Sequence, residues 1–217
     1  MRGWLRPPNG KDPILRRLRA PSLLLGTLLL GLLPAGAALA ADPVATVLTL
    51  AGDCQRNGAK LAVGDAVAVG DTVQAGASCK IKLRLADGSV FAAGPGSRFT
   101  LGEFALDRAA AKRTVRITGA SGYFRALVSK LSPDSRFEVS TATATAAVRS
   151  TDWYLLAEET RSAVGVLEGL VQLSAPDGRS VVIAGGEGAE VAVGQPPTLP
   201  EPWSTERFRN AAAAVGE

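Results

Sequence analysis

The chain has 217 residues, of which 47% are hydrophobic, which is enough to build the core of one compact domain. Its 24 glycines, 13 prolines and 5% aromatic residues indicate short elements joined by turns. A net charge of +4 would suggest nucleic-acid binding. However, six bases and one acid precede Ala41, so the leader carries the positive charge and the remainder is slightly acidic. The charge therefore argues against a nucleic-acid partner.

The first 40 residues have the pattern of a secretory signal peptide. Basic residues at 16–19 precede an uncharged apolar stretch, Pro34 interrupts it, and small residues at 38–40 suit cleavage between Ala40 and Ala41. We therefore expect export to the periplasm or secretion, with no membrane span after cleavage. The alternative is an inner-membrane anchor formed by uncleaved residues 21–41, which are nearly long enough to span a bilayer.

Strand signals recur throughout the rest of the chain, with turn dipeptides such as Asn57-Gly58 and Asp87-Gly88 between them. This pattern predicts an all-β domain over 41–194, built from many short antiparallel strands as a sandwich or a rolled or closed sheet. The predicted strands are 44–50, 79–86, 89–93, 98–101, 113–118, 122–128, 136–141, 153–158, 162–169, 170–175, 180–184 and 189–193.

Both cysteines, Cys54 and Cys79, have the inward phase of their predicted strands. A pair of cysteines in an oxidising compartment predicts a disulfide, which would stabilise the domain by about 3–4 kcal/mol. Two buried thiols are the alternative.

A proline-rich segment and a short helix follow the last predicted strand. Residues 195–202 form a stiff spacer, and the alanine-rich residues 203–215 predict a helix that begins near Ser204. We expect this tail, 195–217, to be an accessory segment that docks on the domain or frays.

Charge divides the exported part into two regions. Residues 80–136 are strongly basic, whereas residues 137–217 are strongly acidic. Either the two regions pair with each other across the domain, or they form a bipolar surface that meets charged envelope partners.

The chain contains no histidine, which removes the commonest general base and zinc ligand. No phosphate-cradling motif or nucleophile elbow is present either. We therefore predict a protein that is not an enzyme and uses no metal or cofactor. A third interpretation is a hydrolase whose active site is a pair of carboxylates.

Three segments together carry a resemblance: VSTATATAAVRSTDW (139–153), VGVLEGLVQLSAPDG (164–178) and IAGGEGAEV (183–191), after Gly-Asp turns and Asp87-Gly88-Ser89. In this order they resemble the FecR protein domain, over about 44–193. Ser150 and Ala142 depart from the Gly and Pro that the family prefers. The resemblance implies an envelope domain that relays a receptor's state to a cytoplasmic anti-sigma segment. The roughly twenty residues before the apolar run are too few for such a segment, so we expect a stand-alone exported member.

Arg149 lies where an uninterrupted strand from Phe137 would point it into the core. Because such a strand would be unusually long, we predict a bend near 144–148 and a new strand that begins at Arg149. We expect Arg149, Thr151 and Asp152 to hold a structural corner; ligand contact is the alternative.

The sequence therefore predicts a non-enzymatic exported envelope module for protein interaction or signal sensing, with an unidentified envelope protein as partner. The alternative is a β domain that binds carbohydrate or peptidoglycan, although this chain has few aromatic residues to stack on sugars.

Overall fold

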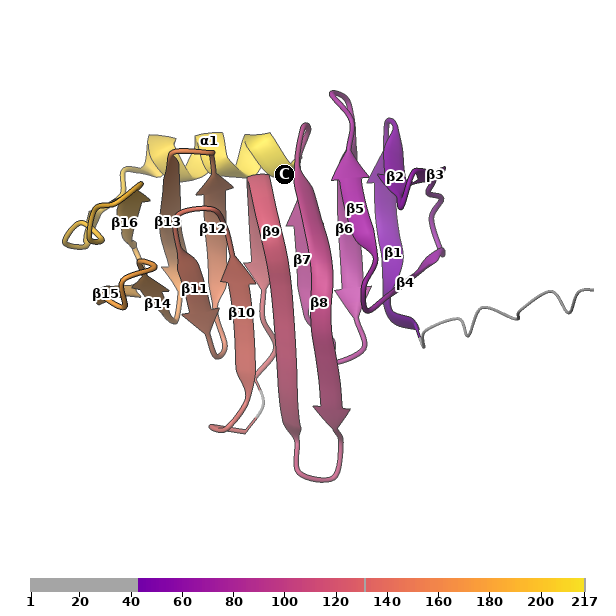
Figure 1. Cartoon of the computed structure of the whole chain (residues 1–217), viewed down its shortest axis with the longest axis horizontal. Coiled ribbons are helices and arrows are strands. Elements are labelled where there is room, and N and C mark those ends of the chain that lie inside the picture. Colours follow the sequence, from indigo (N-terminus) through magenta and orange to yellow (C-terminus); the bar gives the residue numbers. More distant parts are fainter. Residues whose placement is uncertain (1–42, 131, 217) are drawn as a thin grey trace, which may run out of the picture. The chain divides into compact units, whose positions relative to one another are not determined.

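Alternation of inward apolar and outward polar side chains organises most of the computed structural model, which describes residues 43–130 and 132–216 (Figure 1). Strand β6 (Lys80–Leu85) shows the pattern, because Ile81, Leu83 and Leu85 are buried while its basic residues face outward. This period of two is the property that makes a sequence form a half-buried strand. The all-β prediction is therefore confirmed.

The other described strands have these bounds: β1 (Pro43–Ala51), β2 (Cys54–Arg56), β3 (Ala59–Lys60), β4 (Ala66–Ala68), β5 (Thr72–Ala75), β7 (Val90–Ala93), β8 (Arg98–Asp107), β9 (Lys112–Leu127), β10 (Arg136–Ser140), β11 (Thr145–Val148), β12 (Asp152–Ala157), β13 (Arg161–Glu168), β14 (Leu170–Ser174), β15 (Ser180–Ala184), β16 (Glu187–Ala192) and β17 (Glu201–Pro202). One helix, α1 (Thr205–Val215), follows them.

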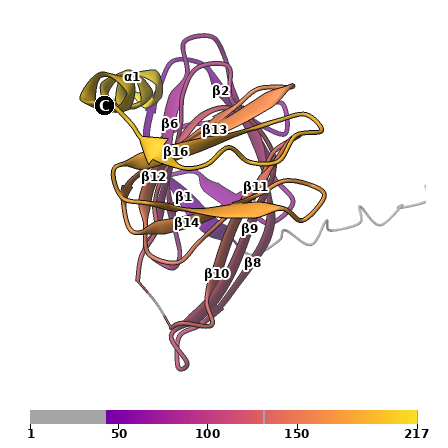
Figure 2. The ribbon, with the colours of Figure 1, turned by 90° about the vertical axis from the view of Figure 1, so that its left-hand side faces the viewer.

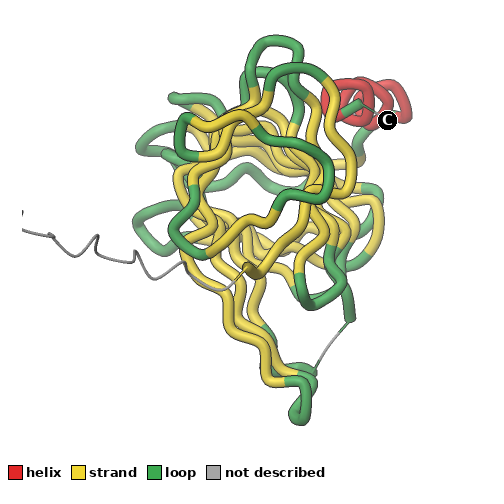
Figure 3. The backbone as a smooth tube through the Cα atoms, turned by 90° about the vertical axis from the view of Figure 1, so that its right-hand side faces the viewer, coloured by secondary structure: helices red, strands yellow, loops and turns green. Residues whose placement is uncertain are grey.

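The strands form two facing sheets that share one strand (Figures 2 and 3). Sheet A has the order β4-β1-β6-β7-β9-β12-β13-β16-β17. Sheet B has the order β3-β2-β5-β8-β9-β10-β11-β14-β15. Among the described strands only β9 and β10 pair in parallel. The sheet does not close into a barrel, so the closed sheet among the predicted architectures is not observed.

Strand β9 belongs to both sheets. Its first half pairs with β8 and β10 in sheet B, and its last residues pair with β7 and β12 in sheet A. Gly119 and Gly122 lie at the crossing with φ of 61° and 106°, a conformation that glycine adopts without steric cost. A Cβ on Gly122 would also overlap Ser97. The sequence predicts two strands in this region, 113–118 and 122–128, and the glycines join them into one.

The hydrophobic core lies between the two sheets. Phe91, Phe99 and Phe124 form an aromatic cluster with ring centroids 5.0–6.0 Å apart. Trp153 on β12 is also buried in this core. Aromatic rings in this offset or edge-on arrangement add stabilisation beyond the burial of their area.

The predicted disulfide is confirmed. Cys54 on β2 is bonded to Cys79, which directly precedes β6, and their Cα atoms are 5.4 Å apart. Both residues are fully buried. Because β2 lies in sheet B and β6 in sheet A, the bond cross-links the two sheets.

The short strands β2 to β5, together with β11 and β17, were not among the predicted strands, because two to four residues are too few to show a period. The predicted cleavage site at Ala40 and Ala41 and the apolar stretch 21–41 lie outside the described residues. Within 43–130 and 132–216, no helix has the length and apolar character needed to cross a membrane.

The C-terminal tail packs against sheet A. Glu190 and Thr198 exchange two hydrogen bonds, of 2.9 and 3.0 Å, so the proline-rich segment runs beside β16 and is not a free spacer. The predicted helix is α1, capped by Ser204 and by Gly216, whose φ is 87°. It lies outside the two layers, on the outer face of sheet A (Figure 3).

Trp203 anchors this tail to the sheet. Its indole covers Gly165 on β13 and Gly188 on β16, where a Cβ on either residue would overlap the ring. The Arg207 guanidinium lies 4.1 Å from the centroid of the indole ring. The two glycines, which we call the glycine floor, therefore leave the space that the ring fills.

We expect Cys54→Ala to lower the free energy of unfolding by about 2–4 kcal/mol, because the unfolded chain loses a cross-link. Denaturant unfolding measures this change. The double variant Cys54→Ala/Cys79→Ala is the control for the released thiol. Equal stability of the wild type with and without reductant would contradict the prediction.

We expect Trp203→Ala to lower the free energy of unfolding by about 3 kcal/mol, because the glycine floor would lose its covering ring. Leu199→Ala, at a highly exposed position of the same segment, is the matched control and should change stability little. Thermal unfolding of both variants tests this, and equal stabilities would show that the tail is not part of the folded unit.

Candidate functional site

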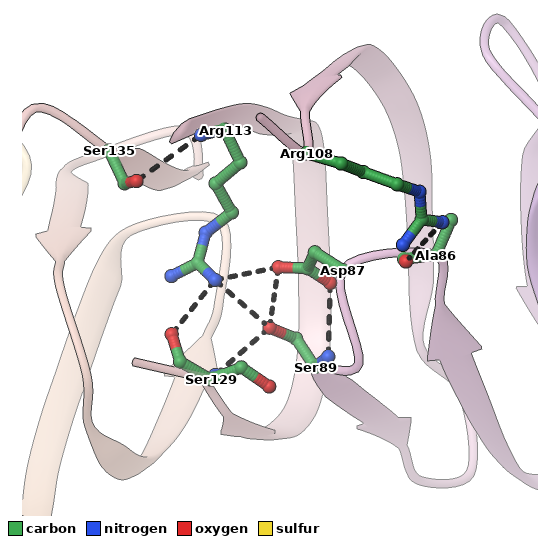
Figure 4. A network of polar contacts seen from close by, with 7 residues as sticks. All are labelled: Ala86, Asp87, Ser89, Arg108, Arg113, Ser129 and Ser135. Atoms are coloured by element: carbon green, nitrogen blue, oxygen red, sulfur yellow. Dashed lines mark hydrogen bonds and ion pairs between the residues drawn. The ribbon is translucent and has the colours of Figure 1, made fainter. Parts of the chain in front are cut away.

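A buried ion pair lies where the turn after β6 meets the start of β9 (Figure 4). The Arg113 guanidinium donates to the Asp87 carboxylate at 2.7 Å and to the carbonyl of Ser129 at 2.9 Å. The Ser89 hydroxyl donates to Asp87 at 2.8 Å and accepts from the backbone N–H of Ser129 at 3.1 Å. Arg113 is 1% exposed, so this network is closed to solvent.

The network suits a structural role. Burial lowers the pKa of the Arg113 guanidinium, while the charge and hydrogen bond of Asp87 raise it. Nε of Arg113 is buried and has no partner within the described part of the chain. A buried ion pair of this kind adds little net stability, but removal of one partner leaves an uncompensated buried charge. Through this network, the turn Asp87-Gly88-Ser89, which is part of the family resemblance, is held against the start of β9.

The predicted bend occurs earlier in the chain than expected. Strand β10 ends at Ser140, the chain bends at 142–143, and residues 145–148 form β11. Arg149 lies in a second bend, is exposed, and makes no hydrogen bond or ion pair with another described residue. It does not begin a strand and does not form the expected corner contacts.

Thr151 and Asp152 do make contacts at this second bend. The Thr151 hydroxyl donates to the carbonyl of Leu170 at 3.1 Å. Asp152 accepts two hydrogen bonds from the Arg125 guanidinium, at 2.8 and 2.6 Å. These bonds raise the pKa of Arg125. Arg125 also lies 5.3 Å from the ring centroid of Tyr154, whose own pKa is raised mainly by burial.

Strand β15 is an open edge of sheet B. It pairs with β14 on one side and with no described strand on the other. The opposite edge of sheet B is β3, which has only two residues. A longer unpaired edge presents backbone donors and acceptors to solvent and can accept a further strand.

The hydrogen-bond pattern shows which backbone groups of β15 point outward. Ala175 and Arg179 form a hydrogen-bonded pair at the hairpin end, and such pairs alternate along an antiparallel ladder. Gln172↔Val182 is therefore a non-hydrogen-bonded pair, so the N–H and C=O of Val182 point away from β14. Ala184, two residues later, donates its N–H to the Glu187 carboxylate at 3.0 Å, which agrees with this phase.

Apolar side chains accompany the open edge. Val182 and Leu170 are each 59% exposed, and both point outward from the same face of sheet B. Exposed apolar groups beside an unpaired edge are a feature of surfaces that bind other proteins. We call this surface, Ser180–Ala184 with Leu170, the β15 edge.

A cavity of about 360 Å³ lies between α1 and the outer face of sheet A. Its walls include Tyr123, Tyr154 and Trp203, and polar side chains from β13, β16 and α1 line its rim. No cluster of three or more metal-ligating side chains occurs within the described residues.

The charges of sheet A match the dipole of α1. At the start of the helix, Arg207 pairs with Glu190, and Glu206 lies in the first turn. At its end, the side chain of Lys80 lies against Gly216. Acids near a helix N-terminus and bases near its C-terminus are both stabilising. Glu190 of the acidic region and Lys80 of the basic region thus lie at the ends of α1 where the helix dipole favours their charges.

The two charged regions of the sequence also pair directly with each other. Arg116 pairs with Glu138 at 3.3 Å, and Arg125 pairs with Asp152 at 2.6 Å. In both pairs the base belongs to 80–136 and the acid to 137–217. Pairing across the domain, one of the two expected uses of the charge, is therefore present at these places.

Sequence reasoning missed Arg113, although the sequence carries a signal for it. Within RTVRIT, Val115 and Ile117 have the inward phase, so counting back by two places Arg113 inward as well. The same count from Phe137 to Arg149 failed because the strand is broken at 141–144.

We expect Arg113→Met to lower the free energy of unfolding by about 3–5 kcal/mol, because Asp87 would be left buried without its cation. Arg149→Met removes the same charge from an exposed bend and should change stability by less than about 0.5 kcal/mol. Chemical denaturation of both variants measures the contrast. A larger loss for Arg149→Met than for Arg113→Met would reverse this assignment.

Comparisons with known proteins agree with the fold. Two crystal structures of a candidate anti-sigma factor from Parabacteroides distasonis, at 2.50 and 1.65 Å resolution, each align with a TM-score of 0.51 at 18% identity. Each alignment covers 64% of this chain and 62% of that protein, so it spans less than two thirds of the relative. At this identity the likeness concerns the fold alone. No curated protein matches the chain.

A family comparison concerns the centre of the chain. Residues 71–172 match the model of the family described as FecR protein. The match is shorter than the resemblance over about 44–193, and it includes Asp87, Arg113 and Asp152. The part of the chain from the residue before β5 into β14 is therefore similar to the FecR protein family.

Proposed function

We propose that this protein is a non-enzymatic exported module that binds another protein of the cell envelope and takes part in signal sensing. The observation that carries the proposal is the β15 edge, which offers an unpaired strand with exposed apolar side chains. The export step rests on the signal-peptide pattern before Ala41.

The regulatory part of the proposal rests on the FecR domain and on the fold shared with a candidate anti-sigma factor. We infer that the domain works by contact with a partner. Asp87, Arg113 and Asp152 are each held in ion pairs within the fold, so these ionisable side chains have a structural role.

The proposed mode of binding is strand addition. An extended segment of the partner would pair with the outward N–H and C=O groups of Ser180 and Val182, and the backbone bonds would give affinity independent of sequence. Apolar side chains of the partner would pack on Val182 and Leu170. The Glu187 carboxylate, which accepts the N–H of Ala184, marks the end of the available edge.

A glycan-binding function has one observation in its favour. Hydroxyl side chains follow one another across sheet B: Thr72 pairs with Thr100 at 2.8 Å, and Ser140 pairs with Thr145 at 3.2 Å. In register with these are Thr118, Ser174 and Ser180. Neighbouring strands lie roughly 4.8 Å apart, so the row offers evenly spaced partners for the hydroxyls of an extended polysaccharide.

The test is a comparison of Val182→Pro with Val182→Ala. Proline removes an outward N–H without breaking a bond to β14, as is tolerated on an edge strand, whereas alanine keeps the N–H. We expect wild type and Val182→Ala to retain the same envelope protein in a crosslinked pull-down, and Val182→Pro to lose it.

Thermal unfolding checks that Val182→Pro folds. Retention of the same partner by the folded Val182→Pro variant would refute strand addition at the β15 edge. Sedimentation with purified peptidoglycan, in the absence of any bound protein, would favour the glycan-binding function instead.

A further inference from the structure

The cavity beside α1 exists because one flank of the helix carries small side chains next to sheet A. Ala211 and Ala214 face the sheet above Tyr154. At these helix positions a larger apolar residue would fill the space, as Val215 does at the end of the helix, where it is buried against Ala92 and Tyr154. The helix packs on sheet A through Phe208, Ala212 and Val215, and a cavity of about 360 Å³ lies along its neighbouring flank.

The cavity walls are rigid and partly aromatic. Trp203 is held between the glycine floor and the Arg207 guanidinium, and the ring centroid of Phe208 is 5.3 Å from that of Trp203. Tyr154 is buried on β12, and the more exposed Tyr123 lies on β9 opposite Leu156, two residues along from Tyr154. Flat, fixed walls of this kind favour a planar apolar ligand, because little side-chain freedom is lost on binding.

The rim of the cavity is rich in hydrogen-bond donors. Arg161 and Arg207 both pair with Glu190, and each has one further acidic partner. Each guanidinium has five N–H donors, so both keep donors beyond these bonds. Asn210 adds an amide at the same rim. Two guanidinium groups in a fork geometry suit a carboxylate, which would share them with Glu190, itself part of the cavity lining.

We propose that this cavity binds a small aromatic carboxylate, with its ring against Tyr154 and Ala211 and its carboxylate at Arg161, Arg207 and Asn210. The volume lies at the small end of the range for ligand pockets, about 300–1,000 Å³, so the ligand has one or two rings. The proposal rests on the signal-sensing part of the proposed function and gives it a small-molecule input. The site is separate from the β15 edge.

Binding of 2-naphthoate to the purified protein tests the proposal, with 2-naphthalenemethanol as the neutral analogue of similar shape. We expect naphthoate to bind about tenfold more tightly than the alcohol, since only the acid forms charge-assisted bonds. Isothermal titration measures both affinities. Equal affinities, or no binding of naphthoate, would overturn the proposal.

Two leucine variants of α1 locate the site. Ala211→Leu fills the cavity and should weaken naphthoate binding at least about tenfold while leaving the melting temperature equal or higher, because it replaces empty volume by packed methyl groups. Ala213→Leu places the same side chain on the exposed face of α1 and should bind naphthoate as the wild type does. Unchanged binding by Ala211→Leu would show that the ligand binds elsewhere.

Val182→Pro separates this inference from the proposed function. It should bind naphthoate normally, because the β15 edge contributes no residue to the cavity. Loss of partner binding with normal naphthoate binding would support two separate sites, whereas loss of naphthoate binding by the folded variant would contradict the location of the ligand under α1.

Discussion

Strand β9 is the constraint on which both sheets depend. Because it pairs with β8 and β10 in one sheet and with β7 and β12 in the other, neither sheet can move without the other. Gly119 and Gly122 allow the crossing, and the buried Arg113–Asp87 pair fixes the start of the strand. The disulfide between β2 and the start of β6 joins the two sheets a second time.

The rigid frame leaves two different surfaces available. The outer face of sheet A is covered by α1, whose direction matches the charge of the sheet from Glu190 to Lys80. Ala211 and Ala214 of the helix line a cavity along one flank of it. Sheet B instead ends at β15, where backbone groups remain unpaired with any described strand. A domain that reports on its surroundings can use both, because a small ligand and a protein partner would occupy separate places.

Alternation predicted most of the longer strands and the inward cysteines, because a period of two is a local property of the chain. Alternation did not predict that β9 crosses between the sheets. The crossing follows from positive φ at Gly119 and Gly122, and in the sequence these glycines look like those of ordinary turns. Arg113 and Arg149 show how phase must be used. The count by two holds within β9 and fails across the bend after Ser140. The position of Trp203 could not be predicted from any local pattern either, because the glycine floor that it covers is built from two separate strands.

The central claim is that the β15 edge is the contact surface for a protein partner. Amide hydrogen exchange tests this claim most directly. It is measured residue by residue, first on the protein alone and then with the envelope protein that the pull-down retains. The account predicts slower exchange at the outward N–H of Val182 when the partner is present, with the N–H of Val181 and Ile183 already protected by β14. Unchanged exchange at Val182, with new protection confined to another strand or to α1, would contradict it.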